Sequence, residues 1–136
     1  GYHVGDYFQH WLDMEKLAPN GPKVFHVNWF RTNNEGKFLW PGFGDNFRVL
    51  EWILKRCEGE VEANETAIGF VPKAEDINIE GLDGITVDTI RDLLSVDRES
   101  WLADIANIKE FYAQVGERVP QAMYDELAAL EARLKA

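Results

Sequence analysis

The chain has 136 residues, 46% of them hydrophobic, which is enough apolar material for one domain with a packed core. Fourteen basic and twenty-four acidic residues give a formal net charge of −10, which argues against nucleic acid and membranes as partners, because DNA, RNA and anionic membranes are bound through cationic surfaces. The single cysteine excludes an internal disulfide and is typical of a cytoplasmic protein. No apolar run approaches the roughly 18 residues that span a bilayer, so we expect a soluble protein.

The first predicted element is an amphipathic helix from about Val4 to Lys16. Its apolar residues recur at helical spacing, namely Tyr7, Phe8, Trp11, Leu12 and Met14. Pro19 and Gly21 are expected to end it. His3 and His10 are too few for a metal site, and we interpret them as packing or surface residues.

A segment rich in aromatic residues and glycine follows, from Val24 to Phe47. It holds seven of the chain's aromatic residues, namely Phe25, Trp29, Phe30, Phe38, Trp40, Phe43 and Phe47. Alternation between Val24 and Trp29 predicts a β-strand. Asn33 to Gly36 are turn residues, so Lys37 to Trp40 are expected to return as the second arm of a hairpin, with Phe30 near Phe38.

The loop that follows, Pro41 to Gly44, places Phe43 between two glycines. Glycine has no Cβ to shield a neighbouring ring, and it lets the backbone turn sharply. Phe43 is therefore expected to be either a plug for the core or a stacking surface for a flat ligand. Asp45 and Asn46 are good N-cap residues for a helix that begins near Phe47.

That helix is predicted from about Asn46 to Cys57, with Gly59 as its stop. Its inner side is expected to carry Val49, Leu50, Ile53, Leu54 and Cys57. Glu58 to Glu65 is interpreted as a solvated loop. Thr66 to Val71 predicts a strand, and Ile77 to Ile79 is interpreted as the start of a second.

The last third of the chain predicts helices. Thr86 or Asp83 can begin a helix over Val87 to Leu94, and Asp97 can cap the next. The apolar positions of the last two helices are Trp101, Ile105, Ile108, Phe111 or Tyr112, and Val115, and then Met123, Leu127, Leu130 and Leu134. Gly116 and Pro120 separate them, which favours an antiparallel helical hairpin over a coiled-coil dimer. The order of elements suggests the α+β class.

Three motifs together carry a resemblance to a known family. FHVNWF, GKFLWPGFGDN and RVLEWIL are similar to the C-terminal part of GTP-dependent phosphoenolpyruvate carboxykinase, and the likeness extends over essentially all 136 residues. The resemblance implies that residues 1–136 are a single fragment from the C-terminal part of a larger α/β enzyme.

The resemblance also implies a guanine-binding segment at residues 24–47. The positions that match the family's guanine-binding phenylalanines are Phe30, Phe38 and Phe43, and Asn46 matches an asparagine that hydrogen-bonds the base. Stacking contributes about 1 to 3 kcal/mol per base and tolerates any base, so the choice of guanine needs an amide on the base edge. Trp29 and Trp40 are interpreted as packing residues.

The activity that the resemblance implies is the conversion of oxaloacetate and GTP to phosphoenolpyruvate, CO2 and GDP in gluconeogenesis, with Mn2+ or Mg2+. The chain has no phosphate-binding motif of the form G-x-x-x-x-G-K-S/T, no clustered metal ligands and no nucleophile paired with a base. We therefore expect the fragment alone to be inactive, with no catalytic or metal-binding residues of its own. Its expected partners are a guanine nucleotide (GTP or GDP) and the missing N-terminal portion of the enzyme.

The resemblance implies a monomeric parent enzyme, whereas the isolated fragment is expected to self-associate through apolar surface where the missing portion docks. A different class of function remains open from the residues alone. The chain could be a non-catalytic acidic interaction module whose aromatic cluster is only core.

Overall fold

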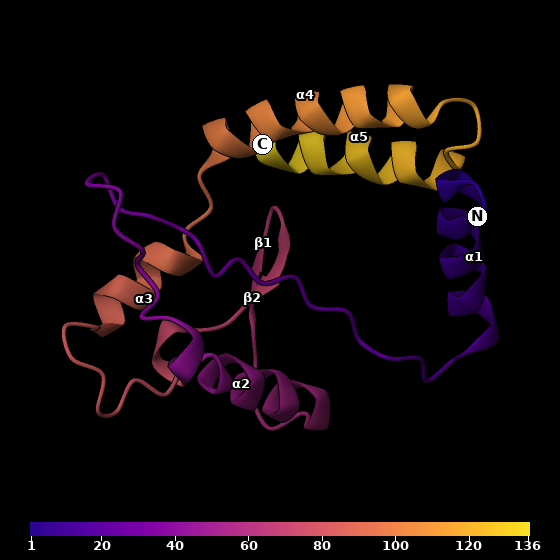
Figure 1. Ribbon diagram of the computed structural model, residues 1–136. Coiled ribbons are helices and arrows are strands. Elements are labelled where there is room, and N and C mark those ends of the chain that lie inside the picture. Colours follow the sequence, from indigo (N-terminus) through magenta and orange to yellow (C-terminus); the bar gives the residue numbers. More distant parts are fainter. The chain divides into compact units, whose positions relative to one another are not determined.

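The computed structural model describes residues 1–136 and has the expected α+β composition (Figure 1). The helices are α1 (Val4–Leu17), α2 (Phe47–Glu58), α3 (Val87–Leu94), α4 (Arg98–Val115) and α5 (Gln121–Lys135), with short 3-10 helices η1 (Phe43–Asp45) and η2 (Ala74–Asp76). Strands β1 (Asn64–Thr66) and β2 (Gly69–Val71) form one antiparallel sheet. None of the helices combines the length and apolar character needed to cross a membrane. The chain divides into two compact units, Lys23–Ser95 and the combination of Gly1–Pro22 with Val96–Ala136.

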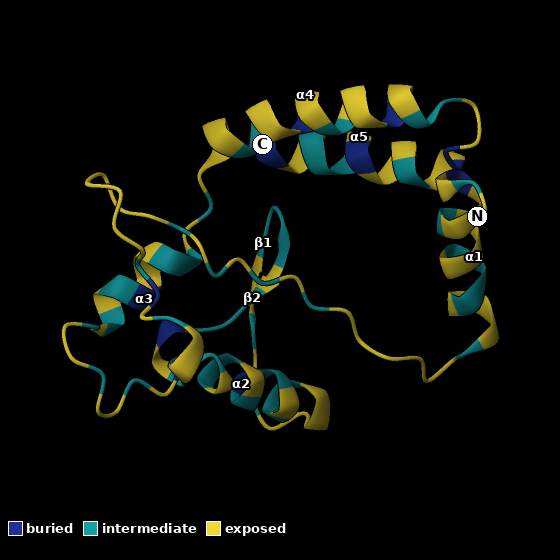
Figure 2. Ribbon diagram, in the orientation of Figure 1, coloured by how far each residue is buried: buried dark blue, intermediate teal, exposed yellow.

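The terminal unit contains the expected helical hairpin. Figure 1 shows α4 and α5 side by side and running in opposite directions. Asp97 Oδ1 accepts hydrogen bonds from the backbone N–H groups of Glu99 and Ser100 at 3.0 and 3.2 Å, which caps α4. Gly116, with φ of 84°, ends it. The buried side chains between the two helices are Ile105, Tyr112, Leu127 and Leu134 (Figure 2).

Helix α1 packs against the connection between α4 and α5. A Cβ at Gly5 would lie 2.3 Å from the carbonyl oxygen of Arg118, so only glycine permits this approach. Arg118 Nη1 also pairs with Asp6 Oδ2 at 3.0 Å. His3 Nδ1 accepts a hydrogen bond from the Gly5 N–H at 3.1 Å, and His3 is therefore the N-cap of α1.

The central unit is built around two buried tryptophans, Trp40 and Trp52. The buried residues Ala74, Ile77 and Ile90 complete this core. Phe25 meets Trp52 edge-on at a centroid distance of 6.3 Å, and Trp29 lies 6.1 Å from Trp40. The interpretation of Trp29 and Trp40 as packing residues is confirmed.

Helix α2 has the expected bounds, and Gly59 ends it with φ of 79°. The prediction of its inner side was wrong at three positions, because Leu50, Leu54 and Cys57 are exposed. Trp52 is buried instead, with Val49 and Ile53 packed against the core. A tryptophan removes more apolar area from water than leucine or cysteine, so the helix turns Trp52 inward.

The predicted strands were placed wrongly, although their burial pattern was right. Residues from Val24 to Trp29 alternate between exposed and half-buried, as in a strand, but no other segment pairs with them. Thr66 to Val71 is divided between β1 and β2, which a turn joins, and β1 begins in the expected loop. Ile77 is buried in the core outside any strand. Apolar periodicity reports which face is buried, not whether the backbone finds a partner.

Helix α3 begins where Thr86 caps it. Thr86 Oγ1 accepts a hydrogen bond from the Thr89 N–H, and Thr89 Oγ1 accepts one from the Thr86 N–H, both at 3.3 Å. This reciprocal pair is a capping box with threonine in both positions. Of the two expected starts, Thr86 is therefore correct.

Glu131 of α5 accepts hydrogen bonds from two ammonium groups, one of which lies on α4. It accepts hydrogen bonds from Lys109 of α4 at 2.6 Å and from Lys135 of α5 at 2.5 Å. These two bonds, with that from Lys109 the stronger, lower the pKa of the Glu131 carboxyl from 4.5 to about 2. A carboxylate whose pKa is lowered by folding stabilises the folded state above its unfolded pKa, and loses that contribution as pH falls through its folded pKa.

Replacing Glu131 by glutamine is therefore expected to lower the free energy of unfolding at pH 7. The difference from the wild type should shrink as pH falls from 4.5 towards about 2. Urea denaturation at a series of pH values measures it. The control is Glu110→Gln on the exposed surface of α4, which makes the same substitution and leaves both hydrogen bonds of Glu131 in place. A Glu131→Gln deficit that stayed constant across this pH range would contradict the assignment.

Candidate functional site

The aromatic hairpin, residues 30–40, has the turn that the sequence predicts. The Leu39 N–H donates to the Arg31 carbonyl and the Asn33 N–H to the Lys37 carbonyl, both at 2.9 Å. Asn33 Oδ1 accepts from the N–H groups of Glu35 and Lys37, and Gly36 adopts φ of 77°. Hydrogen bonds of the backbone and of the Asn33 side chain therefore stabilise the turn of the hairpin.

Phe30 and Phe38 lie together on this hairpin, as expected. Their ring centroids are 5.9 Å apart with an angle of 63° between the planes. The two residues are 71% and 63% exposed. The alternative in which the aromatic cluster is only core is thus wrong for these rings. Paired aromatic rings left in water form an apolar surface of the kind that binds a ligand or a partner.

Phe43 is presented separately, on the 3-10 turn η1. It is 93% exposed, so almost none of its surface is covered by the rest of the protein. Gly42 before it has φ of 124°, a backbone conformation that is strained for any residue with a side chain. Phe43 is therefore not a plug for the core of this chain, and its role as a stacking surface stays a prediction.

Asn46 occupies the N-cap position of α2, as predicted, but its side chain does not cap the helix. Its Oδ1 accepts a hydrogen bond from the indole Nε1–H of Trp40 at 2.9 Å instead. The first turn of α2 is held by Arg48, whose Nε donates to Asp45 Oδ1 at 3.1 Å and whose Nη1 donates to the Asn78 carbonyl at 3.0 Å. The Asn46 amide is therefore tied to the core below the loop.

Arg31 is a site residue that the sequence analysis missed. Its Nη1 donates to the carbonyl oxygens of Leu93 and Ser95 at 3.0 and 2.8 Å, and its Nη2 donates to Ser95 Oγ at 2.9 Å. These bonds fasten the aromatic hairpin to the end of α3. The partners lie 62 and 64 residues along the chain, so no local pattern could have revealed them.

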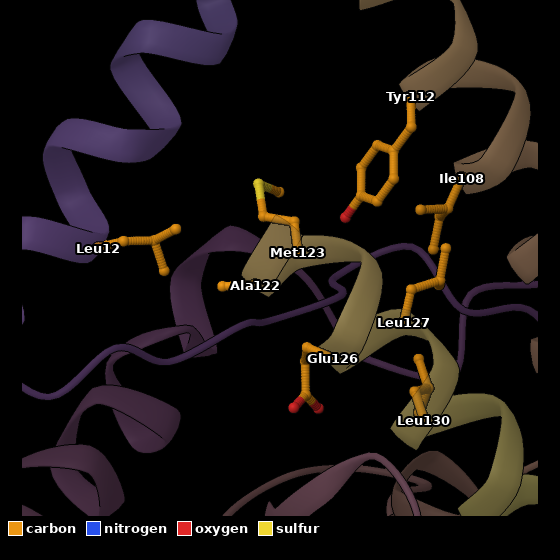
Figure 3. Close-up of a pocket in the computed structure, with 8 residues that line it drawn as sticks. All are labelled: Leu12, Ile108, Tyr112, Ala122, Met123, Glu126, Leu127 and Leu130. Atoms are coloured by element: carbon orange, nitrogen blue, oxygen red, sulfur yellow. The ribbon is translucent and has the colours of Figure 1, made fainter. Parts of the chain in front are cut away.

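Neither the acidic residues nor the pocket of the terminal unit forms a metal or nucleotide site. No three His, Cys, Asp or Glu side chains gather to hold a metal ion, so the Mn2+ or Mg2+ that the resemblance implies does not fit this chain's own residues. A pocket in the terminal unit is lined by Leu12, Ile108, Tyr112, Ala122, Met123, Glu126, Leu127 and Leu130 (Figure 3). Its lining is apolar except for one hydroxyl and one carboxylate, so it lacks the convergent polar groups of a nucleotide site.

Comparison with known proteins gives the same family that the sequence motifs resemble. The family described as the phosphoenolpyruvate carboxykinase C-terminal P-loop domain matches residues 1–133. Proteins named phosphoenolpyruvate carboxykinase (GTP) are similar over nearly the whole chain. The relative from Treponema pallidum is 50% identical over 98% of the chain, and that from Corynebacterium jeikeium 47% identical over 100%. The chain spans 22% of the length of each of these relatives.

Replacing Arg31 by lysine is expected to loosen the aromatic hairpin, because an ammonium group cannot match the guanidinium's fixed fork of donors. A loss of about 1 to 2 kcal/mol would speed hydrogen exchange at the Leu39 N–H by roughly five- to thirtyfold. Exchange measured by NMR tests this. Lys37→Gln, a change at an exposed cation of the same hairpin, is the control and should leave that rate unchanged. Equal exchange rates in Arg31→Lys and the wild type would rule out the anchor.

Proposed function

The chain belongs to the GTP-dependent phosphoenolpyruvate carboxykinase family, and we propose that it supplies the guanine-binding face of a longer enzyme. Phe30, Phe38 and Phe43 stack on the base, and Asn46 hydrogen-bonds its edge. The observation that carries this proposal is the exposure of all three rings on well-defined turns. Exposed rings that the protein itself leaves uncovered are suited to a flat ligand.

The proposed activity of the whole enzyme is the conversion of oxaloacetate and GTP to phosphoenolpyruvate, CO2 and GDP, in the cytoplasm. This chain is the C-terminal part, and its partner is the N-terminal portion of the same monomeric enzyme. Phosphate-binding, metal-binding and oxaloacetate-binding groups belong to that other portion. Phosphoryl transfer depends on positioning and charge neutralisation, and the share of this chain is to position the base.

The phenylalanines and the asparagine have different roles, which follow from the chemistry of the base. A ring face attracts any base, because every base has a π-face, so the phenylalanines supply affinity without choice. Guanine carries an acceptor at O6 and donors at N1 and N2, whereas adenine carries an amino group in place of O6. An amide beside that edge can satisfy guanine and leave an unmatched group against adenine.

This chain contributes little to the binding of the phosphates of GTP. Asp45 places a negative charge at the start of α2, and the net charge of the chain is −10. The 136-residue chain is therefore expected to bind guanosine and GTP weakly and with similar affinity. Fluorescence of Trp29 and Trp40 during titration measures both, and Phe43→Ala should weaken both together. Much tighter binding of GTP than of guanosine would reveal a phosphate site in this chain.

In the full-length enzyme, Phe30→Ala or Phe43→Ala should weaken the binding of GTP and of ATP equally, by about 1 to 3 kcal/mol for each lost stacking face. Asn46→Ala should instead reduce the preference for GTP over ATP by about 1 to 3 kcal/mol, because the hydrogen bond between the amide and the edge of guanine is lost. Values of kcat/KM for both nucleotides decide between these patterns. Phe70→Ala removes an exposed phenylalanine of β2 and is the matched control, with no expected effect on either nucleotide.

Two outcomes would contradict the proposal. If the full-length enzyme bound neither nucleotide, the interaction-module alternative would be favoured, with the exposed rings binding a partner protein. If Asn46→Ala lowered kcat/KM equally for GTP and ATP, Asn46 would only support the loop, and selectivity would come from backbone groups of the turn from Trp40 to Gly44.

A further inference from the structure

The hydrogen bond between Trp40 and Asn46 fixes which way the Asn46 amide points. An asparagine amide has an acceptor, Oδ1, and a donor, Nδ2, and either can face a given neighbour after a rotation of 180°. The indole Nε1–H of Trp40 is only a donor, so the group that meets it at 2.9 Å must be Oδ1. The opposite side of the amide therefore presents Nδ2, which makes no hydrogen bond within the protein.

The indole itself has little freedom to move. Trp40 is 5% exposed and belongs to the core of the central unit, where its ring lies 6.1 Å from that of Trp29. Its N–H thus holds a constant position beneath the loop that carries Phe43. If the amide of Asn46 rotated, two donors would face each other and the indole N–H would lose its acceptor.

We infer that Trp40 is a positioning residue that sets the base selectivity of this site through Asn46. With Oδ1 facing the indole, the opposite side of the Asn46 amide offers N–H donors to a ligand. A base with an acceptor at the facing position, such as O6 of guanine or hypoxanthine, is bound, and a base with an amino group there is rejected. This inference rests on the proposed function and adds the residue that orients the amide.

Burial of an indole does not by itself produce this hydrogen bond. Trp52, in the same core and 4% exposed, has an Nε1–H with no hydrogen-bond partner. The central unit thus holds two buried indoles of similar exposure, of which Trp40 reaches the Asn46 amide. Trp52 therefore provides a matched control, because its replacement removes a similar buried volume without touching that amide.

The test uses the full-length enzyme and compares kcat/KM for GTP, ITP and ATP. Trp40→Phe frees the amide to rotate and to offer Oδ1 to the amino group of adenine. The GTP to ATP ratio should therefore fall by about tenfold or more, the loss expected when a buried polar group is no longer matched. ITP should follow GTP, because hypoxanthine keeps O6. Trp52→Phe should leave the ratio unchanged, even if it destabilises the protein equally.

A second variant guards against misfolding of Trp40→Phe. Replacing Trp40 by benzothienylalanine keeps the size of the ring system and substitutes sulfur for the N–H, and it should lower the GTP to ATP ratio in the same way. An unchanged ratio in this variant, with a reduced ratio in Asn46→Ala, would overturn the role of Trp40 and leave the proposed function standing. An unchanged ratio in Asn46→Ala would instead overturn the reading of the base by Asn46.

Discussion

Burial of Trp40 is the constraint on which the candidate site depends. Trp40 lies between the aromatic hairpin and the Phe43 loop in sequence, so fixing its ring in the core fixes the backbone on both sides. Its neighbour Trp29 packs against it, while Phe30, the residue after Trp29, is 71% exposed. Around Trp29 and Trp40, which pack in the core, the phenylalanines Phe30, Phe38 and Phe43 lie at the surface.

The cations near these rings already serve the structure of the protein. Arg31 donates to the end of α3, and Arg48 donates to Asp45 and the Asn78 carbonyl. Lys37, the remaining cation of the hairpin, lies 3.5 Å from Glu35. These cations therefore have partners within the chain and form no cradle for phosphates.

Turns and helix caps could be predicted from the sequence, whereas packing partners remote in the sequence could not. The turn at Asn33 to Gly36 and the caps at Thr86 and Asp97 depend on residues a few positions apart, and each appears where predicted. The inward turn of Trp52 and the anchoring of Arg31 depend on packing partners remote in sequence. Periodicity cannot identify such partners, because it records burial without naming the neighbour.

In the candidate site, too, the sequence predicts which residues are involved but not how they are arranged. The residues that carry the resemblance, Phe30, Phe38, Phe43 and Asn46, could be named from the motifs. Their exposure and the direction of the Asn46 amide could not, because exposure depends on how the whole unit packs and the amide is held by the indole of Trp40. The preference of asparagine for N-cap positions correctly predicted Asn46 at the start of α2. Its side chain does not cap the helix, because Oδ1 accepts the hydrogen bond of the Trp40 indole instead of one from a backbone N–H of the helix.

The close approach at Gly5 has a consequence for the order of events during synthesis. Helix α1 precedes the central unit in the chain, yet the ion pair between Asp6 and Arg118 joins residues 112 positions apart. The whole central unit and α4 must be translated before α1 can meet this neighbour. The contact between α1 and the connection before α5 can therefore form only after the central unit has been translated, which makes the terminal unit the later of the two to be completed.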